Sequence, residues 1–215
     1  MPQELYVTSL LFSSLALVVS GITAWLTFFR KGKLVMTQPT IVFFGPDGAN
    51  LEGFNKIYLR TLLYSTSKRG QVIESLHVSI KRNESNQNFN IWVYGETGSL
   101  KRGSGIFVSQ EGVTADHHFF PPKDGANFEF LAGKYEVVVY AKSVGSNNFD
   151  ELSKLNLHVT ESQAAKLQEP RTCLLHDWGP DQQVYYSHID TKPESEPNME
   201  KLLGLMANKQ KQADA

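Results

Sequence analysis

The sequence has a single cysteine, Cys173, among its 215 residues, which excludes an internal disulfide framework. It also lacks an excess of either charge, because 21 lysines and arginines stand against 22 aspartates and glutamates. No basic stripe of the kind found in nucleic-acid-binding proteins is visible, so we expect no nucleic-acid partner. The chain shows no nucleotide-binding or metal-binding signature that its context supports, so we expect no cofactor.

The most informative feature is an uncharged run of 25 residues near the N-terminus, from Leu5 to Phe29. A helix of this length reaches roughly 37 Å, which is enough to cross a hydrocarbon core of about 30 Å. Tyr6 and Trp25 lie near the ends of the run, where aromatic side chains favour the membrane interface. We therefore predict a single transmembrane anchor, with the lipid bilayer as its partner.

The charges that flank this run predict its orientation. Arg30, Lys31 and Lys33 follow it directly, whereas Glu4 is the charged side chain that precedes it. Cations next to a span favour the cytoplasmic side of the membrane. We expect a single-pass protein of a plasma or inner membrane, with its C-terminal domain in the cytoplasm.

Small residues recur along the predicted anchor at Ala16, Ser20 and Ala24. A spacing of four places them on one face of a helix, where a second helix can approach closely. This pattern predicts helix packing, either between copies of this chain or with another membrane protein.

After Pro39 the chain alternates between short runs of β-branched or aromatic residues and clusters of Gly, Asn, Asp and Ser, which is typical of an all-β domain. The period-two pattern of a half-buried strand is clear where Leu76, Val78 and Ile80 alternate with polar residues. Leu155 and Leu157 alternate with polar residues in the same way later in the chain. We predict strands over the following ranges: Thr40–Phe44, Lys56–Thr66, Val72–Lys81, Asn88–Tyr94, Gly105–Ser109, Asn127–Leu131, Tyr135–Lys142 and Ser153–Thr160.

One segment narrows the fold class. Residues 128–141 read FEFLAGKYEVVVYA, a short strand and a glycine-containing turn followed by a tyrosine and an alternating strand. This resembles the late strands of immunoglobulin-like and fibronectin-III-like sandwiches, and the resemblance implies that Tyr135 is a corner tyrosine. We expect a mainly β, immunoglobulin-like antiparallel sandwich preceded by one transmembrane helix.

Four segments follow from these patterns. Residues 1–36 form the anchor and its basic flank, and residues 37–160 form the sandwich. Residues 161–190 form a linker, helical around Ser162–Leu167, and a hairpin from Cys173 to Ile189 that turns near Gly179. Residues 191–215 form a polar tail with a short amphipathic helix over Asn198–Lys209.

Two groups of candidate catalytic or metal-binding residues leave an enzymatic function as an alternative. The segment Gly103–His117 resembles the catalytic-histidine turn of trypsin-like proteases, although no matching serine segment follows. His117 and His118, next to Asp116, are also candidate metal ligands. Adjacent residues of a strand point to opposite faces, so one ion does not easily take both histidines. A second cluster of metal-ligand types comprises Cys173, His176 and His188.

The leading hypothesis is a membrane-anchored, non-catalytic β-sandwich module for protein binding or scaffolding. One alternative is a metal-dependent or hydrolytic enzyme that uses Asp116, His117 and His118. The other alternative is an accessory single-pass subunit of a larger membrane complex. The candidate contact residues for a binding module are aromatic: Trp92, Tyr94, Trp178, Tyr185 and Tyr186.

Overall fold

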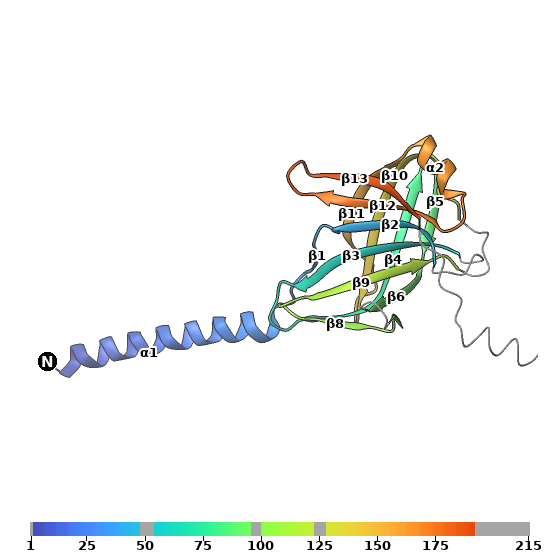
Figure 1. Ribbon diagram of the computed structural model, residues 1–215. Helices are drawn as coiled ribbons and strands as arrows, with labels where there is room; N and C mark the ends of the chain where they lie inside the picture. Colours follow the sequence, from blue (N-terminus) through green and yellow to red (C-terminus); the bar gives the residue numbers. More distant parts are fainter. Residues whose placement is uncertain (1, 48–53, 96–99, 123–127, 192–215) are drawn as a thin grey trace, which may run out of the picture.

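A computed structural model describes residues 2–47, 54–95, 100–122 and 128–191. It confirms a mainly β chain folded into two antiparallel sheets, preceded by one apolar helix that projects away from them (Figure 1). The amphipathic helix predicted over Asn198–Lys209 lies outside the described residues.

The apolar run forms helix α1, Pro2–Ala24, and continues as a π-helical turn, η1, from Trp25 to Phe29. The segment Tyr6–Phe29 is long and apolar enough to cross a membrane, and the domain buries none of it. Along α1, Ala16, Ser20 and Ala24 are exposed, so their common face is open to another helix. Whether a helix packs there stays a prediction.

The first sheet, which we call sheet A, has eight strands among the described residues and runs in the order β13-β12-β2-β3-β9-β6-β7, with β1 also paired to β3. Its strands are β1 (Leu34–Met36), β2 (Ile41–Pro46), β3 (Asn55–Ser65), β6 (Ile91–Gly95), β7 (Lys101–Arg102), β9 (Val113–Phe120), β12 (Thr172–Gly179) and β13 (Val184–Thr191).

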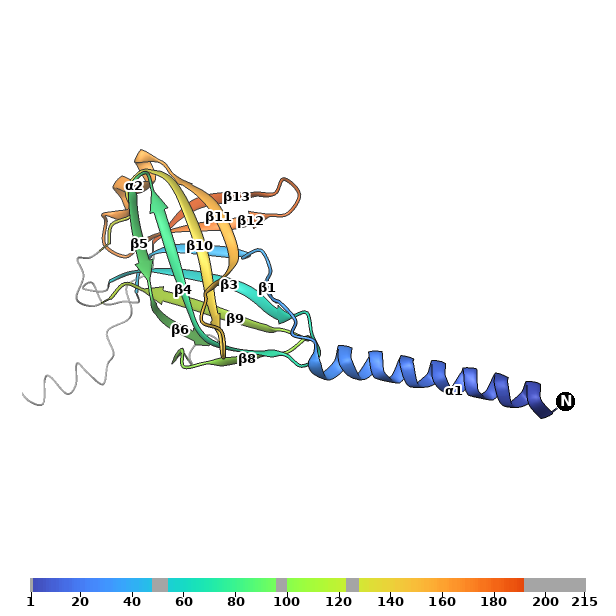
Figure 2. The same cartoon turned by 180° about the vertical axis from the view of Figure 1, so that it is seen from behind.

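The second sheet, sheet B, has five strands in the described part of the chain and runs in the order β11-β10-β4-β5, with β8 also paired to β4 (Figure 2). Its strands are β4 (Gln71–Arg82), β5 (Ser85–Phe89), β8 (Ile106–Val108), β10 (Gly133–Ser143) and β11 (Asp150–Val159). A short helix, α2 (Glu161–Leu167), follows β11 and begins with a capping box between Thr160 and Gln163.

Apolar side chains from the inner faces of both sheets form one core. Phe44 of sheet A stacks on Phe130 with ring centroids 4.4 Å apart, and Tyr135 of sheet B contacts the same ring edge-on. The Tyr135 hydroxyl donates a 2.7 Å hydrogen bond to the Leu131 carbonyl, which is the geometry expected of a corner tyrosine. The two sheets are thus held together as a sandwich.

Two of the predicted strands are wrong in detail. The run Asn88–Tyr94 is not one strand, because the chain leaves sheet B at Asn90 and enters sheet A. The described part of the predicted strand Asn127–Leu131 forms no strand either. Its carbonyls accept hydrogen bonds from the side chains of Asn55 and Tyr135 instead of from a neighbouring strand.

The predicted C-terminal hairpin is present as β12 and β13, and β12 also pairs with β2 along Leu174–Asp177. The hairpin therefore extends sheet A as its last two strands. The helix predicted around Ser162–Leu167 is also present, as α2.

Candidate functional site

Strand β11 is the last strand of sheet B and pairs only with β10 in the described part of the chain. Leu155, Leu157 and Val159 point into the core, while Asn156 and His158 are exposed on the outer face. The apolar side chains of this alternation anchor the strand in the core. The second backbone edge of β11 has no neighbouring strand among the described residues.

The opposite wall comes from the hairpin β12–β13, where Trp178 and Tyr185 are register partners with ring centroids 5.0 Å apart. The Tyr185 hydroxyl donates to the Pro39 carbonyl at 2.7 Å and accepts from Gln38 Nε2 at 3.0 Å. Burial raises the pKa of Tyr185 to about 12, so the phenol stays neutral. These two bonds hold the ring in one place.

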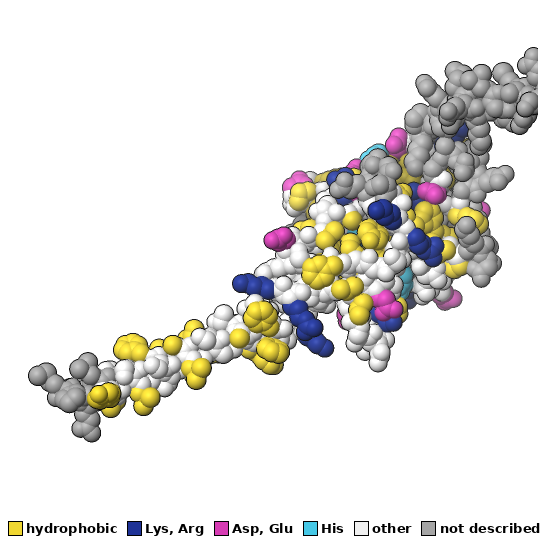
Figure 3. All heavy atoms as spheres, turned by 90° about the horizontal axis from the view of Figure 1, so that it is seen from below, with side chains coloured by type: hydrophobic (Ala, Val, Ile, Leu, Met, Phe, Trp, Pro, Cys, Tyr) yellow, Lys and Arg dark blue, Asp and Glu magenta, His cyan; other side chains and the backbone are white. Residues whose placement is uncertain are grey.

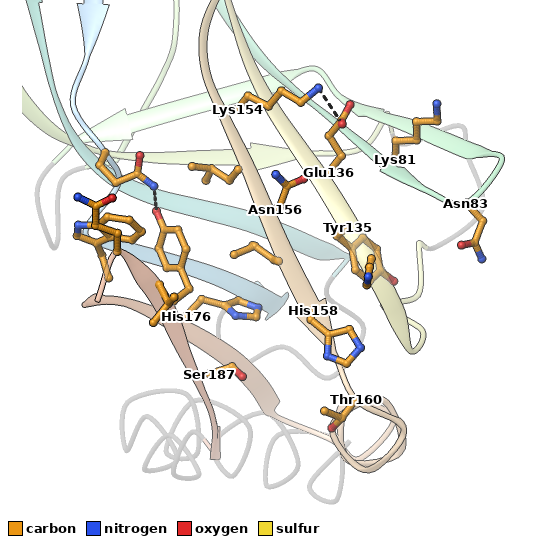
Figure 4. Close-up of a pocket in the computed structure, with 18 residues that line it drawn as sticks. Lys81, Asn83, Tyr135, Glu136, Lys154, Asn156, His158, Thr160, His176 and Ser187 are labelled. Carbon is orange, nitrogen blue, oxygen red and sulfur yellow. Dashed lines mark hydrogen bonds and ion pairs between the residues drawn. The ribbon is translucent and has the colours of Figure 1, made fainter. Parts of the chain in front are cut away.

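Between these walls lies a hollow of about 1020 Å³ (Figure 4). Five consecutive residues, Lys154 to His158, line it. Because successive side chains of a strand point to opposite faces, the feature that five consecutive residues share is the backbone edge. The hollow therefore follows the free edge of β11, with Trp178 and Tyr185 facing it from the hairpin.

His176 lines the inner part of this hollow and is 1% exposed (Figure 4). Its ring contacts Phe44 edge-on at 5.3 Å, and its Nε2 atom has no hydrogen-bond partner among the described residues. Burial, assisted by nearby His188, lowers the pKa of His176 to about 4, so the ring is neutral at neutral pH.

Charged side chains lie on the outer flank of the hollow. Lys154 and Glu136 form an ion pair at 2.8 Å, and the hydrogen bond from Lys154 lowers the pKa of the Glu136 carboxyl. Lys81 and Lys134 also line this flank, so cations outnumber the single carboxylate among the lining residues. The flank therefore favours acidic over basic side chains in a ligand.

The structure separates the three residues of the first enzyme hypothesis, all of which lie on β9. His117 points into the core and is fully buried, and Trp92 Nε1 donates a 3.1 Å hydrogen bond to its Nδ1 atom. Burial lowers the pKa of His117 to about 4. Asp116 and His118 lie on the outer face, where the Tyr58 hydroxyl donates to Asp116 and the Tyr58 ring contacts His118.

The second cluster is also divided by strand alternation. Cys173 is buried and donates to the Asp190 carbonyl, whereas His176 points to the opposite face of β12. His188 lies on the exposed face of β13 and pairs with Asp177 at 3.3 Å. Among the described residues, no three His, Cys, Asp or Glu side chains are placed to hold one metal ion.

The five aromatic residues predicted as contact residues also fall into separate places. Trp92 is 3% exposed and stacks with Tyr94 against the core, so its prediction as a surface contact is wrong. His117 contacts the indole ring, and Gly103 lies so close to it that no room is left for a Cβ atom at that residue. Trp178 and Tyr185 line the hollow, and Tyr186 is exposed on the other face of β13.

Two features of this site were missed from the sequence: the free edge of β11 and the inward position of His176. Alternation over residues 153–160 indicated the strand, but it carried no information on which strand would end the sheet. The inward position of His176 could have been predicted from its place two residues after Leu174, because alternate residues of a strand point to the same face.

Comparison of the chain with protein-family models, with curated proteins and with solved structures finds no match.

Proposed function

We propose that this chain is a membrane-anchored, non-catalytic binding module that takes up an extended segment of a partner protein along the free edge of β11. The observation that carries this proposal is the hollow lined by five consecutive residues of that strand. A ligand in this position meets backbone N–H and C=O groups that pair with no other strand in the described part of the chain, and such groups can pair a new strand to a sheet.

Strand addition separates affinity from specificity. Main-chain hydrogen bonds to β11 supply affinity for any extended segment, and alternate side chains of that segment enter the flanking surfaces. On the inner side the ligand meets Trp178 and Tyr185, which suit an apolar or aromatic side chain. On the outer side it meets the Lys154–Glu136 ion pair together with Lys81 and Lys134, so an acidic side chain is favoured there.

The anchor defines where such a module works. As an uncleaved signal anchor, α1 confines the domain to a membrane surface, which raises its effective concentration for a partner in the same membrane. The exposed cations Arg30, Lys31 and Lys33 favour a cytoplasmic domain at a plasma or inner membrane. We also propose that the sandwich is immunoglobulin-like, because the Tyr135 hydroxyl bonds to the Leu131 carbonyl as a corner tyrosine does.

The orientation can be tested with an introduced cysteine, because the native Cys173 is buried. In a Cys173→Ser background, Ala165→Cys places a thiol at an exposed position of α2. We expect a membrane-impermeant maleimide to label it only after cells are permeabilised. Labelling of intact cells would place the domain on the outer side.

Binding is tested by selecting linear peptides from a random library on the full-length protein in nanodiscs. We expect the selected peptides to be extended, with an apolar residue and an acidic residue on alternate positions. The variant Tyr185→Ala should weaken their binding by about tenfold or more, as for an interface anchor residue. Titration of a labelled peptide by fluorescence anisotropy measures this effect.

The matched control is Tyr186→Ala, one residue along the same strand. Tyr186 is 48% exposed and points to the face that does not border the hollow. The Tyr186→Ala variant should bind the selected peptides as tightly as the unchanged protein does. Equal losses in the two variants, or none in Tyr185→Ala, would exclude the hollow as the binding site.

A further inference from the structure

The connection between the anchor and the domain is short and hydrogen-bonded. The Lys33 amide donates to Thr66 Oγ1 at 2.7 Å, and the Thr66 amide donates to the Lys33 carbonyl at 2.9 Å. Gln71 Nε2 donates to the Gly32 carbonyl at 2.7 Å. Gly32 and Lys33 are thus tied to the β3–β4 turn, so the connection does not act as a free linker.

Close packing reinforces this connection at Gly32. A Cβ atom added to Gly32 would lie 2.5 Å from the backbone nitrogen of Ser67, so no larger residue is accommodated without movement. Since the span ends at Phe29, this end of the domain is held next to the point where the chain leaves the helix. Figure 3 shows Lys and Arg side chains gathered at this junction.

Three exposed apolar side chains lie at the same end of the domain, and we call them the junction patch: Val72, Phe107 and Val144. Phe107 is 57% exposed and Val144 is 63% exposed. They come from separate segments, but Val72 pairs with Phe107, and the Val144 amide donates to the Val72 carbonyl at 2.8 Å. Together they border a hollow of about 630 Å³ that Lys31 and Gly32 also line.

The charges around the junction patch are mainly positive. Lys31 and Arg69 line its hollow, and the exposed cations Arg30, Lys33 and Lys68 belong to the same connecting segments. Asp150 is the acidic residue that lines the hollow among the described residues. On neighbouring segments, Glu74 is paired with Lys142 at 3.1 Å, and Glu111 is exposed.

We infer that the junction patch rests on the lipid bilayer, with Phe107 and Val144 at the boundary between headgroups and acyl chains and the flanking cations on anionic phosphates. The bilayer is the occupant because Lys31 and Gly32, which follow the end of the span at Phe29 by two and three residues, also line this hollow. Exposed apolar side chains ringed by lysine and arginine are the composition of a surface that binds anionic membranes.

This contact would give the domain one orientation on the membrane, with α2 and the far end of β4 directed away from the bilayer (Figures 1 and 2). The inference rests on the membrane anchoring in the proposed function, and it is independent of the peptide-binding hollow.

The experiment uses the full chain in nanodiscs, with an environment-sensitive fluorophore on a single cysteine in the Cys173→Ser background. The test position is Phe107→Cys, and the control position is Ala165→Cys on α2. A third probe, Leu15→Cys, lies within the span and reports whether the helix is in lipid. Spin-labelled lipids in discs with and without anionic lipid act as quenchers.

We expect the probe at position 107 to show blue-shifted emission and quenching by headgroup-labelled lipid, more strongly with anionic lipid. The probe at position 165 should emit as in water and remain unquenched. Water-like emission at both positions, with the probe at position 15 quenched, would overturn the surface contact and leave the anchor intact. Water-like emission at position 15 would overturn the anchor itself and the contact with it.

A charge variant supplies a second measurement. Replacing Lys68 and Arg69 with glutamate, both exposed, should reverse the blue shift at position 107 in anionic discs while circular dichroism stays unchanged. An unaltered shift would exclude these cations as the contact with anionic headgroups.

Discussion

Two buried histidines mark two different regions of the domain. His117 lies in the closed part of the core, where its ring is flanked by Trp92 and Phe119 and its Nδ1 atom accepts the indole hydrogen bond. His176 lies at the edge of the core, where its ring borders an open hollow beside Tyr185. Both rings have a pKa lowered to about 4, and burial is the main cause in each.

The comparison shows that a lowered histidine pKa reports burial and does not by itself locate a functional site. The regions differ in the space that surrounds them. Around His117 side chains fill the interior, whereas beside His176 the two sheets separate and the edge of β11 is accessible. The proposed binding site is therefore placed by the free backbone edge of β11 and not by the titratable groups.

The largest expected difference between the two regions concerns their tryptophans. Trp92→Ala empties a site in the closed core and should lower the free energy of unfolding by about 3–5 kcal/mol. Trp178→Ala removes a half-buried side chain beside the hollow and should cost about 1–2 kcal/mol. Denaturant unfolding of the full chain in detergent, followed by circular dichroism, measures both costs. Equal costs would contradict the difference between the closed core around Trp92 and the open hollow beside Trp178.

Acid should destabilise the protein through both histidines. The folded-state pKa values of about 4 lie below the ordinary value of 6.5, so the unfolded chain binds more protons between these two values. The free energy of unfolding should have its full value above pH 6.5 and fall towards pH 4, by up to about 3 kcal/mol for each histidine.

The matched variants are His117→Gln and His176→Gln, which retain polar groups but do not titrate. Each should remove its own share of the loss between pH 6.5 and pH 4, and the double variant should remove both. Unfolding curves measured across this range check the prediction, and a pH dependence identical to that of the unchanged protein would show that neither ring is held neutral by burial.

The smallest expected difference concerns two tyrosine hydroxyls, each of which donates to a backbone carbonyl at 2.7 Å. Tyr135→Phe removes the corner hydrogen bond from a side chain that is 1% exposed, and should cost about 1 kcal/mol. Tyr185→Phe should cost less than this, because water in the hollow can replace the hydroxyl for Pro39 and Gln38. Thermal unfolding of the two variants compares them, and a greater cost for Tyr185→Phe would contradict the open position of that ring.

Much of the fold could be predicted from local patterns. The anchor is a composition signal, and alternation located the strands around Leu76 and Leu155. The strand order could not be predicted in the same way, because pairing depends on residues far apart in the chain. Strand β12, for example, joins the sheet beside β2, which lies more than a hundred residues earlier.

The strand change at Asn90 could not be predicted from alternation, because Phe89, Ile91 and Val93 alternate as in one strand, and it becomes visible in the burial of the folded chain. Phe89 and Trp92 are both buried, three residues apart, which is incompatible with one continuous strand of period two. The candidate site could be predicted only in part. The sequence indicates Trp178 and Tyr185 as aromatic contact candidates, but the hollow beside them forms because β11 and the hairpin end two different sheets on the same side of the sandwich.

The most direct test of peptide recognition along the free edge of β11 is amide hydrogen exchange of the full chain in nanodiscs, with and without a peptide selected from the random library. Sheet B offers an internal comparison, since β11 and β5 are its two end strands. Slower exchange on binding should appear within Asp150–Val159 and be absent from Ser85–Phe89. Protection of β5 or of another surface, with β11 unchanged, would contradict recognition along the free edge.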